Sequence, residues 1–232
     1  KETDLYIGFF GYEILCNLLN IKIKNQKKLR FHKGVFYKPE TLIKVRKDIK
    51  DNTYQNYIKN LKKIPESIKE SLETENNIQL MAKEFLKAKG SMFLGRGSSF
   101  PIALEGALKL KELSYLHAEG YPAGEMKHGP LALIEEGLPV IIIAPKDKYF
   151  EKTLSNMQEV IARGGKIFFI TDNKKDISND NIRFGLRVPF LNELLSPILL
   201  TGPLQLLAYH VALLKNCDID KPRNLAKSVT VE

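Results

Sequence analysis

Short apolar runs alternate with segments of helical periodicity over most of the second half of this chain. The apolar runs occupy 91–94, 140–144, 166–171 and, as a last short one, 186–189. The helical segments between and after them occupy 100–117, 148–163 and 194–215. Continuous apolar strands that are separated by helices indicate a parallel sheet covered on both faces. Since such crossovers are right-handed, the sequence predicts an α/β fold, a three-layer αβα sandwich with a doubly wound parallel sheet.

A helical N-terminal extension is expected before this alternating part. Residues 36–63 carry apolar side chains at helical spacing, and Pro65 suits the first turn of a second helix over 64–72. A third helix is predicted over 77–89, because the glycine that follows is a typical residue at a helix end. The segment 13–23 fits either an apolar helix or a buried strand.

The net charge of +9 is concentrated in one segment. Residues 22–63 hold fourteen lysines and arginines against three acidic residues, a net charge of about +11, so the remainder is about −2. Aromatic residues lie among these charges, which is one feature of nucleic-acid-binding proteins. Because no nucleic-acid-binding motif accompanies the charge, solvated helices are the favoured interpretation, and a nucleic-acid partner is the alternative.

Cysteine usage and hydropathy indicate the compartment. The two cysteines, Cys16 and Cys217, predict neither a disulfide framework nor a metal site. Reduced thiols are usual in the cytoplasm, which is therefore the expected compartment. Apolar runs such as 139–145 are too short to cross a bilayer, and the first residues lack the pattern of a signal peptide.

The turn that joins the first apolar run to its helix, Gly95–Ser99, suits a ligand. Its glycines let the backbone come close to a bound group, and the following helix offers free N–H groups. Ser98 and Ser99 fit either as helix caps or as substrate-binding groups that hold a hydroxyl or a phosphate. A purely structural strand-to-helix turn explains the same pattern, so this motif by itself leaves the alternatives open.

Three charged residues share one face of the helix over 100–117. Glu105 and Lys109 are four residues apart, and Lys109 and Glu112 are three apart, which are the spacings of neighbours on a helix. One interpretation is a ladder of surface ion pairs, each of which contributes little to stability. The other interpretation is a catalytic base, Glu112, whose charge Lys109 tunes.

Two further residues complete a set of reactive groups. His128 stands beside a Gly-Pro pair in a polar loop, where both catalytic and merely solvent-exposed histidines are found. Lys227 lies among small, uncharged residues, whereas the other lysines are crowded together. A lysine amine, a carboxylate and a loop histidine suit proton transfer next to a sugar carbonyl.

Four segments carry a resemblance to a known family, and they are 95–112, 117–133, 202–210 and 220–232. Together they resemble the C-terminal sugar isomerase (SIS) region of the glutamine–fructose-6-phosphate aminotransferases (isomerizing), also called glucosamine-6-phosphate synthases. The resemblance implies that residues 53–232 are the second SIS subdomain with its C-terminal tail. It also implies that residues 1–52 are a remnant of the first isomerase subdomain plus a basic linker.

The resemblance implies roles for individual residues. It places Glu112 at the base that moves a proton between C1 and C2, with Lys109 as an associated lysine of the site. It places Lys227 at the lysine that forms a Schiff base with the ketose C2, and Ala226 at a backbone contact to the sugar. His128 corresponds to the ring-opening histidine, which in the family reaches the site of the neighbouring subunit, so a homodimer is implied. No metal or organic cofactor is implied.

The chain departs from the family on its N-terminal side. The family's glutaminase needs a cysteine at the mature N-terminus, but this chain begins with Lys1, and Cys16 is no substitute. The first isomerase subdomain, with its loop for the sugar phosphate, is almost wholly missing. The resemblance therefore implies a truncated isomerase part, weak or inactive alone, of an enzyme that converts fructose 6-phosphate and glutamine to glucosamine 6-phosphate and glutamate. A non-catalytic phosphosugar-binding SIS module is the alternative.

Overall fold

The computed structural model describes residues 52–223, with side chains from residue 55 onward. The predictions made for residues 1–51, including most of the basic segment, and for Ala226 and Lys227 lie outside the described residues. The chain divides into two units after Lys62, and the fold described below is that of the second unit. The helices and strands of the described residues follow in the order α2 (Asn52–Leu72), α3 (Glu75–Lys83), β1 (Gly90–Gly95), α4 (Ser99–Ser114), β2 (His117–Pro122), η1 (Ala123–His128), η2 (Pro130–Leu133), β3 (Pro139–Ile143), α5 (Phe150–Ile161), β4 (Lys166–Thr171), η3 (Lys174–Ile177), β5 (Ile182–Arg187) and α6 (Ser196–Leu214), and α2 crosses the boundary between the two units.

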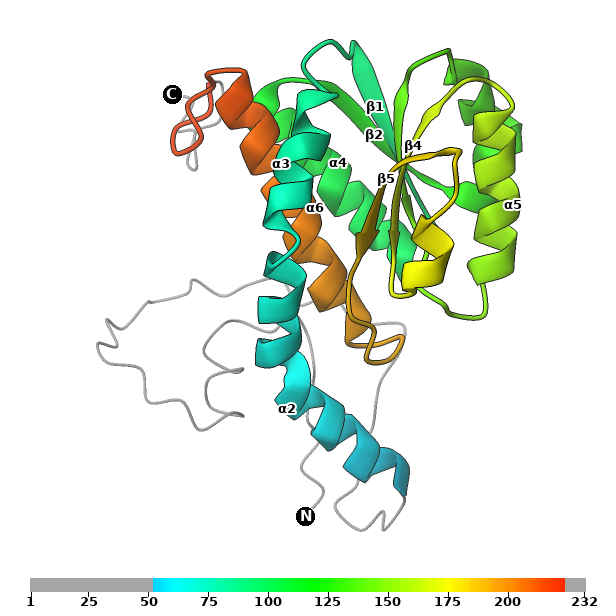
Figure 1. Ribbon diagram of the computed structural model, residues 1–232, viewed down its shortest axis with the longest axis vertical. Helices are drawn as coiled ribbons and strands as arrows, with labels where there is room; N and C mark the ends of the chain where they lie inside the picture. The colour runs from blue at the N-terminus through cyan, green and yellow to red at the C-terminus, as the bar shows by residue number, and fades with distance from the viewer. Residues whose placement is uncertain (1–51, 224–232) are drawn as a thin grey trace, which may run out of the picture. The chain divides into compact units, whose positions relative to one another are not determined.

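The five strands form one parallel sheet in the order β2-β1-β3-β4-β5. From β1 the chain passes through α4 to β2, at one edge of the sheet. After β3, on the other side of β1, it passes through α5 to β4 and so moves towards the opposite edge. The strand order therefore reverses between β1 and β3, which is the place where ligands bind in many doubly wound sheets. Figure 1 shows α3, α4 and α6 on one side of the sheet and α5 on the other. The predicted three-layer αβα sandwich is confirmed.

Two apolar cores lie on the two faces of this sheet, because side chains alternate along each strand. Phe93, Ile141 and Phe168 point into the core beneath α3, α4 and α6. Their immediate neighbours in sequence, such as Ile142 and Phe169, point into the core beneath α5 and η1. Both sets are fully buried, which explains why the strands read as unbroken apolar runs.

Helix α4 lies close to the sheet because small residues face it. A Cβ on Gly106 would lie 2.9 Å from side-chain atoms of both Phe93 and Leu204, so a larger residue at this position would push the helix away. Ala103 and Ala107 complete this face and are buried. Close packing of α4 against β1 and α6 fixes the direction in which its polar face points.

Helix α6 is the one described helix whose length and composition would allow it to cross a membrane, with a mean hydropathy of 1.5 over its most apolar window. The sequence predicted a helix here, at 194–215, but membrane crossing was considered only for shorter apolar runs such as 139–145. In the fold α6 packs against α4 and α3, and half of that window is buried within the protein. Burial in the core therefore accounts for its apolar composition.

Strand β2 was missed by the sequence analysis, and β5 was placed a few residues too late, at 186–189. Both are edge strands, so only part of each is covered and their apolar pattern is weak. β2 carries the polar residues His117, Glu119 and Tyr121, so the sequence shows no apolar run at this strand. β2 lies beside β1 because the two strands form parallel backbone hydrogen bonds, and the sequence of β2 alone does not reveal this pairing.

The helical extension differs from the prediction in two respects. Pro65 lies inside α2 and does not begin a new helix, because Ile64 and Ile68 bury one continuous face on both sides of it. Helix α3 ends at Lys83, six residues before the predicted end at 89. The backbone continues in tighter turns that direct Phe85 into the core, where its ring lies 5.1 Å from that of Phe168.

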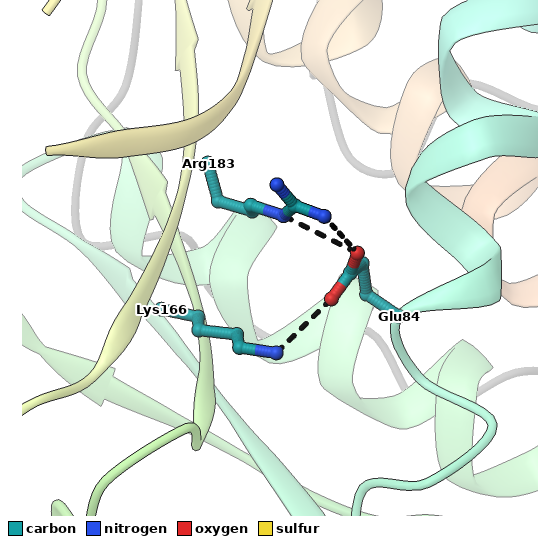
Figure 2. Close-up of polar contacts among 3 residues, drawn as sticks. All are labelled: Glu84, Lys166 and Arg183. Atoms are coloured by element: carbon teal, nitrogen blue, oxygen red, sulfur yellow. Dashed lines mark hydrogen bonds and ion pairs between the residues drawn. The ribbon is translucent and has the colours of Figure 1, made fainter. Parts of the chain in front are cut away.

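A charged cluster joins the end of α3 to the sheet (Figure 2). One carboxylate oxygen of Glu84 accepts hydrogen bonds from Arg183 at 2.6 and 3.2 Å. The other oxygen accepts one from Lys166 at 3.1 Å. These donors, Arg183 before Lys166, hold the pKa of Glu84 below its usual value although burial acts in the opposite direction.

We expect the variant Glu84→Gln to lower the free energy of unfolding at pH 7 by about 0.5–1 kcal/mol, as for other partly exposed ion pairs. Because the folded-state pKa is lowered, the contribution of Glu84 is fully present above the unfolded-state pKa of about 4.3. It is lost as the pH falls through the lower folded-state value. Urea unfolding at pH 7 and at pH 3 would measure the difference.

The control for this experiment is Glu70→Gln, which removes a more exposed carboxylate that pairs with Arg187. Its effect at pH 7 should be smaller, because 45% of the Glu70 side chain is exposed against 19% for Glu84. An effect of Glu84→Gln that is equally large at both pH values would show that charge is not the cause.

Candidate functional site

The last turns of α4 carry the predicted acid–base pair. Nζ of Lys109 lies 2.7 Å from Oε2 of Glu112, and each side chain is 31% exposed. Lys109 is the sole hydrogen-bond partner of the Glu112 carboxylate among the residues whose side chains the structure describes. The structure thus brings these two predicted site residues into direct contact on a half-buried surface.

The charge of Lys109 is set by this contact. The pKa of Lys109 is raised, first because its ammonium group donates a hydrogen bond to Glu112, whereas burial acts in the opposite direction. The carboxylates of Glu112 and Glu105 add electrostatic attraction to the cation. A lysine is positively charged at neutral pH in any case, and the raised pKa of Lys109 extends this charged state to higher pH.

In the turn after β1, the glycine at position 95 packs against the first turn of α4, and the predicted approach to a ligand stays a prediction. A Cβ on Gly95 would lie 2.2 Å from the carbonyl oxygen of Ser99, and Gly97 has a φ of +54°. Ser98 occupies the N-cap position of α4 but makes no side-chain cap hydrogen bond. Oγ of Ser99 is buried and has no partner among the described residues. Neither serine caps the helix through its side chain.

The two serines and the acid–base pair lie at opposite ends of α4. Glu112 lies thirteen positions after Ser99, which is about 20 Å along a helix axis. Helix α4 begins where β1 ends, so the serines lie at the carboxyl edge of the sheet. Lys109 and Glu112 lie towards the opposite edge, so the structure does not bring the serines to the pair.

His128 also lies away from the pair within one chain. It ends η1, which buries Ala123 and Met126 in the core on the α5 side of the sheet. Helix α4 covers the other side, as Figure 1 shows. The His128 side chain is 76% exposed, and its Nε2 lies 3.8 Å from Oε2 of Glu125. One chain therefore holds His128 and Glu112 on opposite faces of its sheet.

A contact that the sequence analysis did not predict lies next to Glu112. Tyr115, the residue that closes α4, accepts a hydrogen bond at its Oη from the backbone N–H of Arg223, at 2.7 Å. The guanidinium group of Arg223 lies over the same ring, 4.2 Å from its centroid. The pair is separated by more than a hundred residues, so no local pattern could have revealed it.

Two other polar regions contain none of the predicted site residues. A hollow of about 630 Å³ lies between α5 and the segment around η3, and Glu151, Gln158 and Asp176 are among its lining residues. On β2, the hydroxyl of Tyr121 donates to Glu119, which raises the pKa of Tyr121. Within residues 52–223 no group of three or more histidine, cysteine and acidic side chains is arranged to hold a metal ion.

Comparison with known sequences gives two kinds of match. The family model for the SIS domain matches residues 84–215. The chain is 52% identical over 177 residues to the glutamine–fructose-6-phosphate aminotransferase (isomerizing) of Bartonella henselae, which covers 76% of this chain and 29% of that enzyme. The enzyme of the same name from Xanthomonas campestris pv. campestris is 52% identical over 79% of this chain and 30% of its own length. The chain thus spans about 30% of the length of these curated relatives.

Comparison with solved structures gives the same result for the fold. The C-terminal domain of glucosamine-fructose-6-phosphate aminotransferase from Francisella tularensis matches with a TM-score of 0.69 and 44% identity. This match covers 71% of the present chain and 46% of that one. Glucosamine-6-phosphate deaminase from Thermotoga maritima matches with a TM-score of 0.55 and 24% identity, over 75% and 49% of the two chains. The second likeness concerns the fold alone.

Proposed function

This chain belongs to the SIS domain family, and we propose that it is the sugar-isomerase part of a glutamine–fructose-6-phosphate aminotransferase. The observation that carries the proposal is the Lys109–Glu112 contact of 2.7 Å on α4, in a chain about half identical to enzymes of that name. We assign residues 53–232 to the second SIS subdomain with its tail. Residues 1–52 are assigned to a remnant of the first subdomain and a linker.

The proposed reaction begins with ring opening and the formation of an imine. His128 assists opening of the sugar ring, after which the amine of Lys227 adds to the C2 carbonyl of fructose 6-phosphate and water leaves. Backbone atoms of Ala226 contact the sugar. Ammonia derived from glutamine then replaces the lysine at C2, and the lysine amine is released. The sugar now carries an imine at C2, which makes the protons on C1 more acidic.

Glu112 acts on that imine as a general base. Its carboxylate takes a proton from C1 and returns it to C2, while the C1 hydroxyl becomes the aldehyde and a proton equivalent to the one it loses is taken up by the imine nitrogen, which becomes the C2 amine. The products of the complete reaction are glucosamine 6-phosphate and glutamate. Lys109 remains charged beside the carboxylate, and Glu112 raises its pKa. This chemistry calls for neither a metal nor an organic cofactor.

We propose a homodimer, which the positions of the two groups support. His128 and Glu112 lie on opposite faces of the sheet in one chain, so a site that uses both must combine residues of two chains. A symmetric dimer contains two such sites, each with Glu112 from one chain and His128 from the other. We place the protein in the cytoplasm, in agreement with a composition that offers no disulfide framework.

Mixing two inactive variants tests the shared site. We expect concentrated wild-type chain to convert fructose 6-phosphate slowly to glucose 6-phosphate, and Glu112→Gln and His128→Ala each to lose this activity. An equal mixture of the two variants should recover about a quarter of the wild-type rate. Half of the randomly formed dimers are mixed, and each mixed dimer contains one intact site of two.

The opposite results separate the alternatives. A mixture that stays inactive although mixed dimers form would mean that His128 does not act across subunits. Binding of fructose 6-phosphate without any conversion by the folded wild-type chain would favour the alternative, a non-catalytic phosphosugar-binding module. Mass spectrometry of the intact dimers shows whether the two variants have exchanged subunits. An inactive mixture can then be distinguished from one in which no mixed dimers formed.

A further inference from the structure

We propose that Arg96, Asn156 and Glu159 form a clamp that holds η1 against α5 and so sets the position of His128. This inference rests on the proposed function for the role of His128 in opening the sugar ring. It assigns the three clamp residues as positioning residues, which do not touch the substrate and act through the short helix that ends at His128. All of the contacts involved lie in the part of the chain that the structure describes.

Arg96 forms the first half of the clamp. It lies in the turn after β1, and its Nη1 donates a hydrogen bond to Oδ1 of Asn156 at 3.1 Å. Asn156 belongs to α5 and is buried. The guanidinium group also lies against the backbone of η1, because a Cβ on Gly124 would be 2.4 Å from Nη2 of Arg96. One arginine therefore contacts α5 and η1 at the same time, and the absence of a side chain at position 124 makes room for it.

Glu159 forms the second half of the clamp. Its Oε1 lies 3.0 Å from Nζ of Lys127, the residue that precedes His128. Glu159 follows Asn156 by three residues on α5, so the two side chains share one face of that helix. The other carboxylate oxygen of Glu159 is buried and has no hydrogen-bond partner among the described residues. Because a buried charge is costly unless it is paired, the contact with Lys127 favours the position that η1 takes on α5.

The contacts before His128 decide where its side chain lies. The histidine itself is 76% exposed, and its Nε2 is 3.8 Å from Oε2 of Glu125, so its own contacts are weak. On its C-terminal side, Gly129 has a φ of +141° and open space where a Cβ would be, which leaves the backbone free to turn. On its N-terminal side, Met126 is fully buried in the core beneath α5. The clamp adds polar contacts on this anchored side of His128.

Two variants loosen the clamp at different points. Gly124→Ala displaces the guanidinium group of Arg96, and the flexible end of that side chain can move away at little cost to the fold. Glu159→Gln keeps the shape of the side chain but removes the charge that attracts Lys127. The matched control is Arg187→Ala, which removes an arginine from an exposed ion pair at the end of β5.

Amide hydrogen exchange tests the clamp without any substrate. We expect residues 123–128 to exchange about fivefold faster in Gly124→Ala and in Glu159→Gln, because local opening of η1 becomes easier. The strands β3 and β4 should exchange at the wild-type rate in both variants, and residues 123–128 should do so in Arg187→Ala. Wild-type exchange of residues 123–128 in both clamp variants would overturn the clamp.

A sugar that cannot close its ring tests the positioning role. 5-Deoxyfructose 6-phosphate lacks the hydroxyl group that forms the furanose ring, so it stays open and needs no ring opening. We expect His128→Ala to lower kcat/KM for fructose 6-phosphate far more than for this open sugar. Gly124→Ala and Glu159→Gln should show the same selectivity with a smaller loss, about tenfold for fructose 6-phosphate, as expected for a misplaced catalytic group.

The two sugars also separate the possible failures. A general effect on the fold would lower kcat/KM for both sugars alike, so equal losses in the clamp variants would refute the positioning role. Unchanged conversion of both sugars by the clamp variants would refute it as well. If His128→Ala itself does not distinguish the two sugars, the proposed role of His128 in ring opening fails, and the positioning role fails with it.

Discussion

Replacing Lys227 by alanine is expected to abolish the capture of fructose 6-phosphate by borohydride. Reduction turns an imine into a stable secondary amine, so the sugar stays attached only where a lysine amine has formed that imine. Mass spectrometry of the digested chain would locate the added sugar phosphate on the peptide that contains Lys227. Lys221→Ala removes an exposed lysine six residues earlier and should leave the capture unchanged.

The charge of Lys227 can be separated from its chemistry. Lys227→Arg keeps a positive charge at this position but offers no amine that can form an imine at neutral pH. It should therefore behave like Lys227→Ala in the trapping experiment. Capture that persists in both variants, with the label on another lysine such as Lys109, would show that the tail lysine is not the Schiff-base residue.

The second large effect is expected at Glu112. We expect Glu112→Gln to slow the release of deuterium from C1 of labelled fructose 6-phosphate by about 10²–10⁴-fold, the usual contribution of a general base. Glutamine has nearly the same shape and can accept a hydrogen bond from Lys109, but it cannot take a proton from carbon. Imine trapping on Lys227 should continue, because that step does not need the carboxylate.

The neighbouring acid provides the control for this experiment. Glu105 lies on the same helix and also attracts Lys109, so Glu105→Gln changes a nearby charge without removing the base. It should slow the release of deuterium far less than Glu112→Gln does. Equal effects of the two variants would mean that Lys109 and Glu112 form only a surface ion pair. That is the alternative interpretation that their spacing on the helix allowed.

The buried strands could be predicted from the sequence with good accuracy. β3 and β4 are covered on both faces, so residues 140–143 and 167–170 are all apolar and buried, and the runs at 140–144 and 166–171 were evident. The edge strands β2 and β5 were missed or displaced, because partial exposure permits polar residues there. The Lys109–Glu112 contact was also predictable, since spacing on one helix decides it.

Other parts of the site depended on how distant segments come together. The spacing of His128 from Glu112 in the sequence does not reveal that η1 and α4 cover opposite faces of one sheet. Arg183 reaches Glu84, and Arg223 reaches Tyr115, across about a hundred residues in each case. Such contacts depend on the order of the strands and the direction of each crossover, which local patterns do not encode.

The sequence by itself therefore determined the fold class, the buried strands and the polar face of α4, because hydrophobic periodicity decides which side of each element is buried. Only the tertiary structure decided that Ser99 and Glu112 lie at opposite ends of α4 and that His128 lies on the far face of the sheet. It also brought Arg223 to Tyr115. The physical reason is that side-chain pattern acts over a few residues, whereas strand order and helix packing position residues that are far apart in the chain.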